Sequence, residues 1–374
     1  MKVPRYNYPA QFPDPDTVQA RIRRALLEGD YILGESVERF EQAFADYLGA
    51  AHVVGVNSGT DALVLALTAA GVEAGDEVIT VANTFHATVA AIVAVGATPI
   101  LVDSEPGTYL MDLHAVEAAI GPRTCAIIAV HLFGRTLDMD RLTALTHRHG
   151  LLLIEDCAQA VGARWGTQRV GTFGALGCFS FHPSKNLAAA GDAGAVTSSD
   201  DELAEQLRIL RGLGQDGQDN HVTVGMNSKL DALQAIILHS KLDHLDEWNQ
   251  ARARVALDYH ERLTDPRLTV SAPAQPPGDH VHHLFQVEVP NRDTLVKRLR
   301  GDGVDAVVRY PVPIHRQPAF AGQPFARHHY PNAEQQAATT LCLPMRPDLT
   351  EPDIDYVCDR LEAAVIDIER NSTT

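Results

Sequence analysis

The chain has few lysines, no run of basic residues and no long apolar stretch. Acidic residues outnumber basic ones by 48 to 31, which gives a net charge of −17. Because nucleic acids are bound largely through their phosphates, a chain without a basic run is not expected to bind DNA or RNA. A membrane-spanning helix needs about 20 apolar residues in succession, and the sequence contains no such run. We therefore expect neither a nucleic-acid partner nor a membrane partner.

The cysteines are also few. There are five, an odd number, and none forms a CxxC pair. This usage is typical of reduced thiols in a cytoplasmic protein, and it predicts no metal site. The first nine residues contain no apolar segment of signal-peptide length. We therefore expect a soluble, cytoplasmic protein.

The central part of the chain predicts an α/β fold. A length of 374 residues favours two domains around a cleft. Near-continuous apolar strands separated by helices are typical of a mostly parallel sheet that is covered on both faces. We predict strands at 52–56, 77–81, 99–103, 125–131, 151–155, 178–181 and 194–198, with helices at 61–70, 87–95, 113–120 and 139–148.

The flanking regions predict further helices and a smaller α/β unit. Residues 14–49 indicate two helices with a break at 29–34, and a long helical stretch is expected at 228–263. Residues 273–279 resemble a linker. The smaller unit is predicted from strands 282–289 and 304–308 and helices 293–300, 333–340 and 351–369. We divide the chain, with the domain change inside the long helix, into an N-terminal arm (1–20), a large domain (21–240) and a small domain (241–374).

Lys185 is the first candidate functional residue. It is one of only five lysines, and the other four are terminal or lie in polar, helix-like surroundings: Lys2, Lys229, Lys241 and Lys297. Lys185 instead follows a short apolar strand and Pro183, and a glycine-rich segment comes after it. An amine becomes a nucleophile when its pKa is lowered, and its usual covalent partner is a carbonyl such as the aldehyde of pyridoxal phosphate. An ordinary surface lysine in a loop is the alternative.

Three other stretches would complete a site for pyridoxal phosphate. Residues 57–63 join a strand to a helix, and the backbone of Gly59 with the hydroxyls of Ser58 and Thr60 could cradle a phosphate, although ordinary helix capping explains them as well. Asp156 ends an apolar strand, where it could pair with a pyridine nitrogen or cap the next helix. Phe85 offers a face for a flat ring, with a core phenylalanine as the alternative.

These stretches closely resemble the DegT/DnrJ/EryC1/StrS family of sugar aminotransferases, which have the aspartate aminotransferase (type I) fold. The resemblance runs from about residue 25 to about 350. The segments 245–249 and 310–315 are similar to the subgroup that aminates C3 of keto sugars carried on thymidine diphosphate. The motifs that carry the resemblance are residues 57–63, 75–79, 84–88, 130–134, 155–160, 180–187, 191–195 and 227–231.

The resemblance implies a role for each matching residue. Lys185 would form the Schiff base with pyridoxal 5′-phosphate and then act as the acid and base that moves the proton, with pyridoxamine 5′-phosphate as the intermediate form. Asp156 would pair with the pyridine nitrogen, Gln159 would hydrogen-bond the ring hydroxyl and Phe85 would stack on the ring. The phosphate would be held by Gly59, Thr60 and Ser180, with Asn227 reaching in from the second subunit of a homodimer.

The resemblance also implies the reaction. L-glutamate or L-glutamine would load the cofactor, and a keto sugar nucleotide would take the amine. Lys229 and Arg309 depart from the pattern that is usual in the family, because they replace an arginine and a histidine. The segment 187–190 departs from it as well. The candidate substrate contacts are His86, Lys229, Arg309, Tyr310 and His315. Alternatives are an aminotransferase for a keto-cyclitol, a dehydratase of the same fold, which Lys185 disfavours, and a non-catalytic sensor.

Overall fold

A seven-stranded sheet forms the centre of the protein. The computed structural model describes residues 1–270 and 277–372. The strands lie in the order β1-β9-β8-β5-β4-β2-β3. β9 runs antiparallel to both its neighbours, and the other pairs are parallel. The predicted mostly parallel α/β fold is confirmed, with strands β1 (His52–Val56), β2 (Glu77–Val81), β3 (Thr98–Val102), β4 (Thr124–Val130), β5 (Leu152–Asp156), β8 (Leu176–Ser180) and β9 (Gly194–Ser198).

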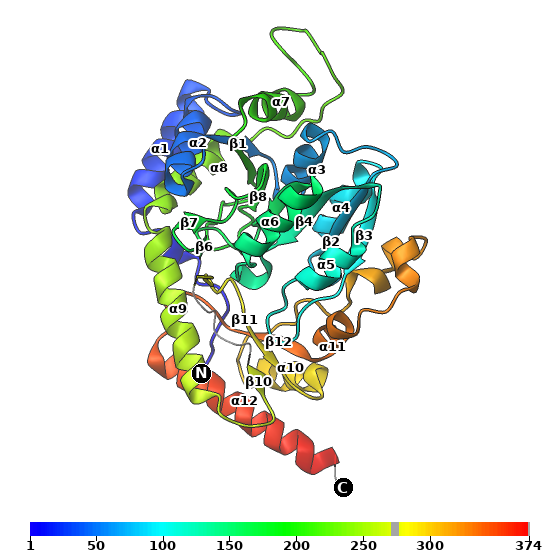
Figure 1. Cartoon of the computed structure of the whole chain (residues 1–374). Helices are drawn as coiled ribbons and strands as arrows, with labels where there is room; N and C mark the ends of the chain where they lie inside the picture. The colour runs from blue at the N-terminus through cyan, green and yellow to red at the C-terminus, as the bar shows by residue number, and fades with distance from the viewer. Residues whose placement is uncertain (271–276, 373–374) are drawn as a thin grey trace.

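Helices cover both faces of this sheet (Figure 1). Successive side chains of a strand point to opposite faces, so Val53 packs in the cluster with α2 and α8, whereas Val54 packs in the cluster with α3 and α7. The burial of both faces explains why the strands are almost continuously apolar. The helices of this part are α1 (Pro15–Glu28), α2 (Glu35–Leu48), α3 (Gly59–Ala69), α4 (His86–Ala94), α5 (Leu113–Ala119), α6 (Met139–His149), α7 (Asp201–Arg211) and α8 (Ala232–Leu242).

The predicted long helix at 228–263 is wrong as a single element. It is two helices, α8 and α9 (Leu245–Arg262), because the chain turns at Asp243 and His244. α9 still joins two hydrophobic cores. Leu245 packs in the cluster beside the large sheet, and Tyr259 packs in the core of the smaller unit. These two cores support our proposal of an arm (1–20), a large domain (21–240) and a small domain (241–374).

The smaller unit lies below the large sheet in Figure 1. Its three-stranded antiparallel sheet has the order β10-β11-β12. The predicted strand at 304–308 is wrong, because Val304 and Val307 form only isolated bridges, to Val3 and Cys342. The predicted linker at 273–279 falls mostly outside the described residues. The elements are β10 (Thr269–Val270), β11 (Phe285–Glu288), α10 (Arg292–Gly301), α11 (Pro331–Thr339), β12 (Thr340–Leu343) and α12 (Glu351–Ser372).

Several short elements connect these units or lie between them. A two-stranded hairpin is formed by β6 (Arg164–Trp165) and β7 (Gln168–Arg169), and 3-10 turns occupy Pro9–Gln11, Leu132–Gly134, Ile314–Arg316, Pro318–Phe320 and Pro324–Arg327. The N-terminal arm crosses from one core to the other, since Val3 packs in the small core and the ring of Phe12 lies 4.1 Å from the amine of Lys241 on α8.

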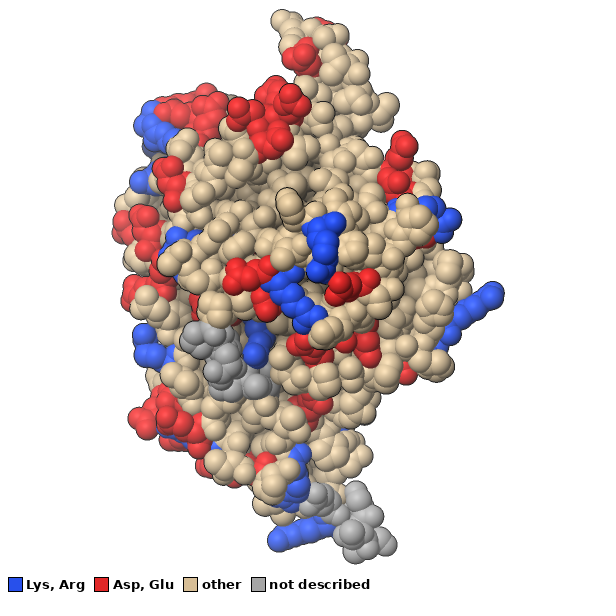
Figure 2. All heavy atoms as spheres, in the orientation of Figure 1, with Lys and Arg blue, Asp and Glu red and all other residues tan. Residues whose placement is uncertain are grey.

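The surface carries no continuous basic patch on the face drawn in Figure 2, where acidic side chains are spread among single basic ones. This agrees with the net charge of −17. Among the described residues, no helix is both long and apolar enough to span a bilayer.

Candidate active site

A cavity of about 450 Å³ lies at the carboxyl edge of the large sheet. Strands β4, β5 and β8 run parallel and end at Val130, Asp156 and Ser180, so the residues at and after those ends meet there. The side chains around the cavity come from both cores and from the arm. They include Tyr6, Gly59, Thr60, Thr84, Phe85, His131, Asp156, Gln159, Ser180, His182, Lys185, Asp192, His283, Arg309 and Tyr310.

Lys185 lines this cavity. Its N–H donates to the carbonyl of His182 at 2.8 Å, which closes the tight turn after β8. Burial lowers the pKa of its amine from about 10.5 to about 8; the Asp156 charge acts against this shift and the Arg309 charge adds to it. Within residues 1–270 and 277–372, the amine makes no hydrogen bond or ion pair. A lysine of this kind is available as a nucleophile near neutral pH.

Lys241 shows that a lowered pKa does not by itself identify the functional lysine. The sequence predicts polar surroundings for it, and this is wrong, because only 1% of Lys241 is exposed. Burial lowers the pKa of its amine to about 8 as well. However, its amine donates to the carbonyl of Ala188 at 2.7 Å, and it is not among the residues that line the cavity. Lys241 is therefore structural.

Asp156 is the buried carboxylate of the cavity. Its Oδ2 accepts from the hydroxyl of Thr88 at 2.8 Å, and its Oδ1 accepts from the N–H of Ala158 at 3.1 Å. Burial raises the pKa of this carboxyl group. A cation bound beside it would favour the ionised form, as a protonated ring nitrogen does.

The neighbouring Glu155 is buried too, but it has a structural role. It accepts hydrogen bonds from the N–H groups of Gly171, Phe173 and Gly174, each at 2.8 Å, and lies 3.2 Å from His131 Nε2. His131, Glu155 and Cys157 form the one cluster among the described residues with metal-ligand spacing. Because the carboxylate is already satisfied by four donors, we assign no metal to it.

Gln159 is held between two elements. Its Oε1 accepts from the N–H of Phe133 at 2.6 Å, and its Nε2 donates to the hydroxyl of Tyr310 at 2.8 Å. The exposed ring of Phe85 lies beside Tyr310, with 5.6 Å between the centroids. Gln159, Phe85 and Tyr310 therefore form one wall of the cavity, although their residue numbers are far apart.

The start of α3 fits a phosphate. A Cβ on Gly59 would lie 2.5 Å from Cβ of Ser180, and one on Gly194 would lie 2.5 Å from the carbonyl of Ser58, so both positions require glycine for this close approach. The first N–H groups of a helix have no partner inside it and can bind an anion. Gly59, Thr60 and Ser180 line the cavity, while Ser58 Oγ accepts from the N–H of Asp61 and caps α3. The residues present therefore fit a phosphate-bearing, aldehyde cofactor such as pyridoxal phosphate.

Besides Ser58, four predicted site residues do not line the cavity. His86, the first residue of α4, stacks on Phe320 with 4.9 Å between the rings. His315 is buried, and its Nε2 lies 2.7 Å from Glu334. Asn227 is exposed and Lys229 is half-buried on the segment that follows α7. None of the four is among the residues that line the cavity of Lys185.

The sequence interpretation missed several residues of the cavity. Tyr6, on the N-terminal arm, lies in the cavity wall, and so does His283, which follows the segment outside the described residues. Thr88, one turn into α4, supports Asp156. The only sequence signal for His283 was its place in the histidine-rich run His280–His283, which does not distinguish a core histidine from a functional one.

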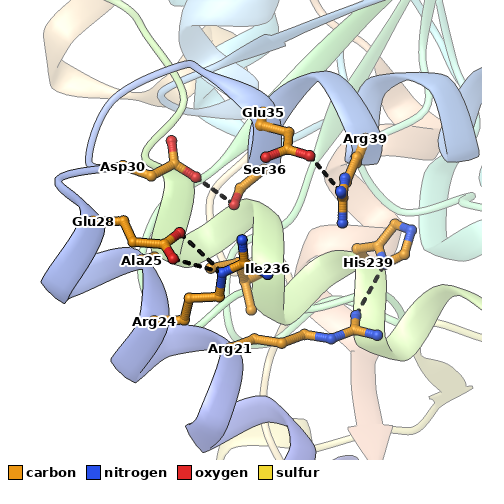
Figure 3. A pocket seen from close by; sticks show the side chains of 10 residues that line it. All are labelled: Arg21, Arg24, Ala25, Glu28, Asp30, Glu35, Ser36, Arg39, Ile236 and His239. Carbon is orange, nitrogen blue, oxygen red and sulfur yellow. Dashed lines mark hydrogen bonds and ion pairs between the residues drawn. The ribbon is translucent and has the colours of Figure 1, made fainter.

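A second hollow, shown in Figure 3, lies between α1, α2 and α8. Its charged groups pair with one another: Arg24 with Glu28, Arg39 with Glu35, and Arg21 with His239. We assign it no catalytic role.

The sheet order and the cavity define a class of enzyme. An amine of lowered pKa, a buried carboxylate at a neighbouring strand end and a glycine-lined helix start are what a pyridoxal-phosphate enzyme of the type I fold requires. The chain matches the model of the DegT/DnrJ/EryC1/StrS aminotransferase family over residues 14–362, and it belongs to this family of pyridoxal-phosphate-dependent aminotransferases.

Individual relatives are similar over almost their full length. The chain is 45% identical over 341 residues to dTDP-3-amino-3,4,6-trideoxy-alpha-D-glucose transaminase of Streptomyces venezuelae, covering 91% of this chain and 90% of the relative. It is 45% identical over 354 residues to UDP-N-acetyl-3-dehydro-alpha-D-glucosamine 3-aminotransferase of Acidithiobacillus ferrooxidans, covering 94% and 95%. The crystal structure of S. venezuelae DesV with a ketimine intermediate has a TM-score of 0.93 and 43% identity, covering 97% and 98%.

Proposed function

We propose that this enzyme transfers an amino group from L-glutamate or L-glutamine to C3 of a keto sugar carried on a nucleoside diphosphate. A dTDP-3-keto-6-deoxyhexose is the acceptor we favour, in the biosynthesis of a deoxyaminosugar for a natural product. The observation that carries the proposal is the joint presence of Lys185, Asp156 and Gln159 in a cavity that also contains Arg309. The two relatives above, whose names specify 3-amino and 3-keto sugars on dTDP and UDP, support the acceptor class.

The chemistry is divided between the cofactor and this chain. When bound, pyridoxal phosphate supplies the carbon that carries the amino group and a ring that acts as an electron sink. Nζ of Lys185 takes the proton from the substrate carbon and later returns one, which an amine with a pKa of about 8 can do near neutral pH. Asp156 would stabilise the positive charge of the ring nitrogen, and Gln159 would orient the ring through its hydroxyl.

Arg309 is the proposed contact for an anionic substrate group. Its guanidinium lines the cavity, and it makes no hydrogen bond or ion pair with any described residue. The net charge of −17 repels a carboxylate or a diphosphate, so a local cation is needed to hold either. Tyr310, beside it, is held by Gln159 and provides a hydroxyl to the substrate.

A panel of sugar nucleotides tests the acceptor. The reaction is run in reverse, with dTDP- and UDP-linked 3-amino and 4-amino sugars and an aminocyclitol as amino donors and 2-oxoglutarate as acceptor. We expect kcat/KM for a dTDP-3-amino sugar to exceed that for the 4-amino sugars by about 10²-fold, because a site that hydrogen-bonds one arrangement of hydroxyls rejects another strongly. Preference for the aminocyclitol would replace the proposed acceptor by a cyclitol.

We also propose that the enzyme works as a homodimer. Leu27 and Tyr31 are 70% and 53% exposed at the end of α1, and Val224 is 92% exposed on the segment that projects beyond α7 (Figure 1). The bridge from Ile32 to Asp231 places the turn after α1 next to the segment that carries Asn227 and Lys229, and we take the exposed apolar side chains of these two regions as the contact surface. A second subunit docked on this surface would cover the apolar groups and would bring Asn227 to the phosphate and Lys229 to the substrate.

The dimer is tested by placing a charge in this surface. Leu27→Asp is expected to sediment as a monomer and to lose activity, because burying an unpaired carboxylate in an interface is costly. Leu257→Asp is the matched control, since Leu257 is 58% exposed on α9, away from this surface. Equal sedimentation of the two variants would place the dimer contact elsewhere.

The cellular location we propose is the cytoplasm. All five cysteines are free, and four of them are buried, which suits a reducing compartment. Detection of the protein in the periplasmic or secreted fraction of fractionated cells would contradict this.

A further inference from the structure

A chain of hydrogen bonds begins beside Lys185 and leads to His283. Asn249 donates from Nδ2 to the carbonyl of Val161 at 3.0 Å. Asn186 donates from Nδ2 both to Oδ1 of Asn249 at 2.8 Å and to the carbonyl of Val281 at 2.9 Å. Because a backbone carbonyl can only accept, these contacts determine which end of each amide is the NH₂ group.

The orientation of Asn186 determines the tautomer of His283. The acceptor Oδ1 of Asn186 lies 3.3 Å from Nδ1 of His283. Only a protonated Nδ1 can donate to it. A neutral imidazole carries one proton, so Nε2 of His283 keeps its lone pair and is a hydrogen-bond acceptor.

His283 stays neutral in this environment. Its side chain is buried, and burial together with the positive charges of Lys185, Arg252 and Arg309 holds the pKa of the ring well below its usual value. A group with so low a pKa is a poor general base at neutral pH, but it remains a good acceptor.

Among the described residues, His283 and Lys185 each have a side-chain nitrogen without a hydrogen-bond partner. Both line the cavity at the sheet edge. The two atoms are Nε2 of His283 and Nζ of Lys185, and neither is sealed off from the cavity that both residues line, so each is free to form a hydrogen bond within it. The lysine side chain has rotatable bonds that allow its amine to move within the cavity, whereas the ring is held by Asn186.

We propose that His283 is a positioning residue for Lys185, whose free amine donates a hydrogen bond to Nε2 of His283 during proton transfer. One N–H of the amine is then anchored, and its lone pair is left free for the substrate carbon. A neutral acceptor suits this role, because a carboxylate at the same place would raise the basicity of the amine and keep it protonated. The proposal rests on the aminotransferase chemistry above but not on the identity of the sugar.

Two variants distinguish the effect of the hydrogen-bond acceptor of His283 from the effect of the shape of its ring. His283→Phe keeps the volume and removes the acceptor, while His283→Gln keeps an acceptor oxygen. His282→Asn is the matched control, since His282 is the adjacent histidine but does not line the cavity. We expect His283→Phe to slow the half-reaction with L-glutamate by about tenfold to a hundredfold, with KM changed by less than about threefold, and His283→Gln to recover most of the rate.

A second readout uses the apoprotein and needs no turnover. The pH dependence of Lys185 labelling by an amine-reactive reagent, followed on its peptide by mass spectrometry, should give a midpoint of about 8 in the wild type. Loss of the acceptor disfavours the ammonium form, so the midpoint should fall in His283→Phe and return in His283→Gln. The ¹⁵N-histidine spectrum of the apoprotein should assign the proton of His283 to Nδ1.

Three results would overturn the proposal. One is equal loss of rate in His283→Phe and His282→Asn. Another is a labelling midpoint that does not differ between His283→Phe and the wild type. The third is a ¹⁵N spectrum with the proton of His283 on Nε2.

Discussion

Lys185→Ala is expected to lower kcat by about 10⁴-fold or more, since the variant loses both the covalent attachment of the cofactor and the group that moves the proton. The amine of Lys185 has a pKa of about 8, and no other lysine is among the described residues that line the cavity, so no neighbouring amine replaces it. Visible absorption should show no band from a lysine-linked cofactor, even when pyridoxal phosphate is bound. Addition of a small primary amine should restore part of the half-reaction with L-glutamate.

The matched control is Lys241→Met. Lys241 has the same lowered pKa of about 8, but its amine donates to the carbonyl of Ala188 outside the cavity. We expect this variant to lose thermal stability and to keep kcat within a few-fold of the wild type. If Lys185→Ala kept its absorption band and its turnover, the assignment of the catalytic lysine would be wrong.

Asp156→Asn is expected to lower kcat by about 10²- to 10⁴-fold, because removal of one partner of a buried ion pair costs about 3–5 kcal/mol. The amide keeps the shape of the side chain and can still accept from Thr88 or Ala158. It cannot hold a positive charge on the ring nitrogen, so the cofactor is a weaker electron sink. Single-turnover absorption changes with L-glutamate measure this loss directly.

The melting temperature of the apoprotein distinguishes a loss of catalysis in Asp156→Asn from a loss of folding. Burial raises the pKa of Asp156, so its ionised form is less favourable in the folded chain than in water. The apoprotein of Asp156→Asn should therefore melt at the wild-type temperature or above it. Glu155→Gln is the contrasting variant, because Glu155 satisfies three backbone N–H groups, and its melting temperature should fall. A loss of stability in Asp156→Asn equal to that in Glu155→Gln would contradict the proposed role.

The strands of the large sheet were predictable because their signal is local. Each is a short apolar run between helices, and the predicted bounds lie within about two residues of the observed ones. The smaller unit was less predictable. The strand expected at 304–308 forms only isolated bridges, and β12 was missed, because short strands at the edge of a small sheet depend on pairing with distant segments.

The residues of the candidate site also fall into those that the sequence predicted and those whose role or burial it could not decide. Lys185 and Asp156 were predicted from their place after apolar strands, and parallel strands carry such residues to one edge, whereas Gln159 was predicted from the family resemblance. The sequence could not decide between a phosphate contact and a helix cap for Ser58, and the structure has it as the cap of α3. It also could not show that Lys241 is buried, because the packing of α8 against α2 and the arm decides that.

By itself, the sequence determined the fold class and the family and predicted the residues proposed to bear the chemistry, because these depend on patterns that are local along the chain. Only the tertiary structure decided which distant side chains share the cavity. It added Tyr6 and His283 to the cavity, placed Thr88 against Asp156, left His86 and His315 outside, and oriented His283 through Asn186. The physical reason is that a hydrogen bond acts over about 3 Å in space and is independent of separation along the chain.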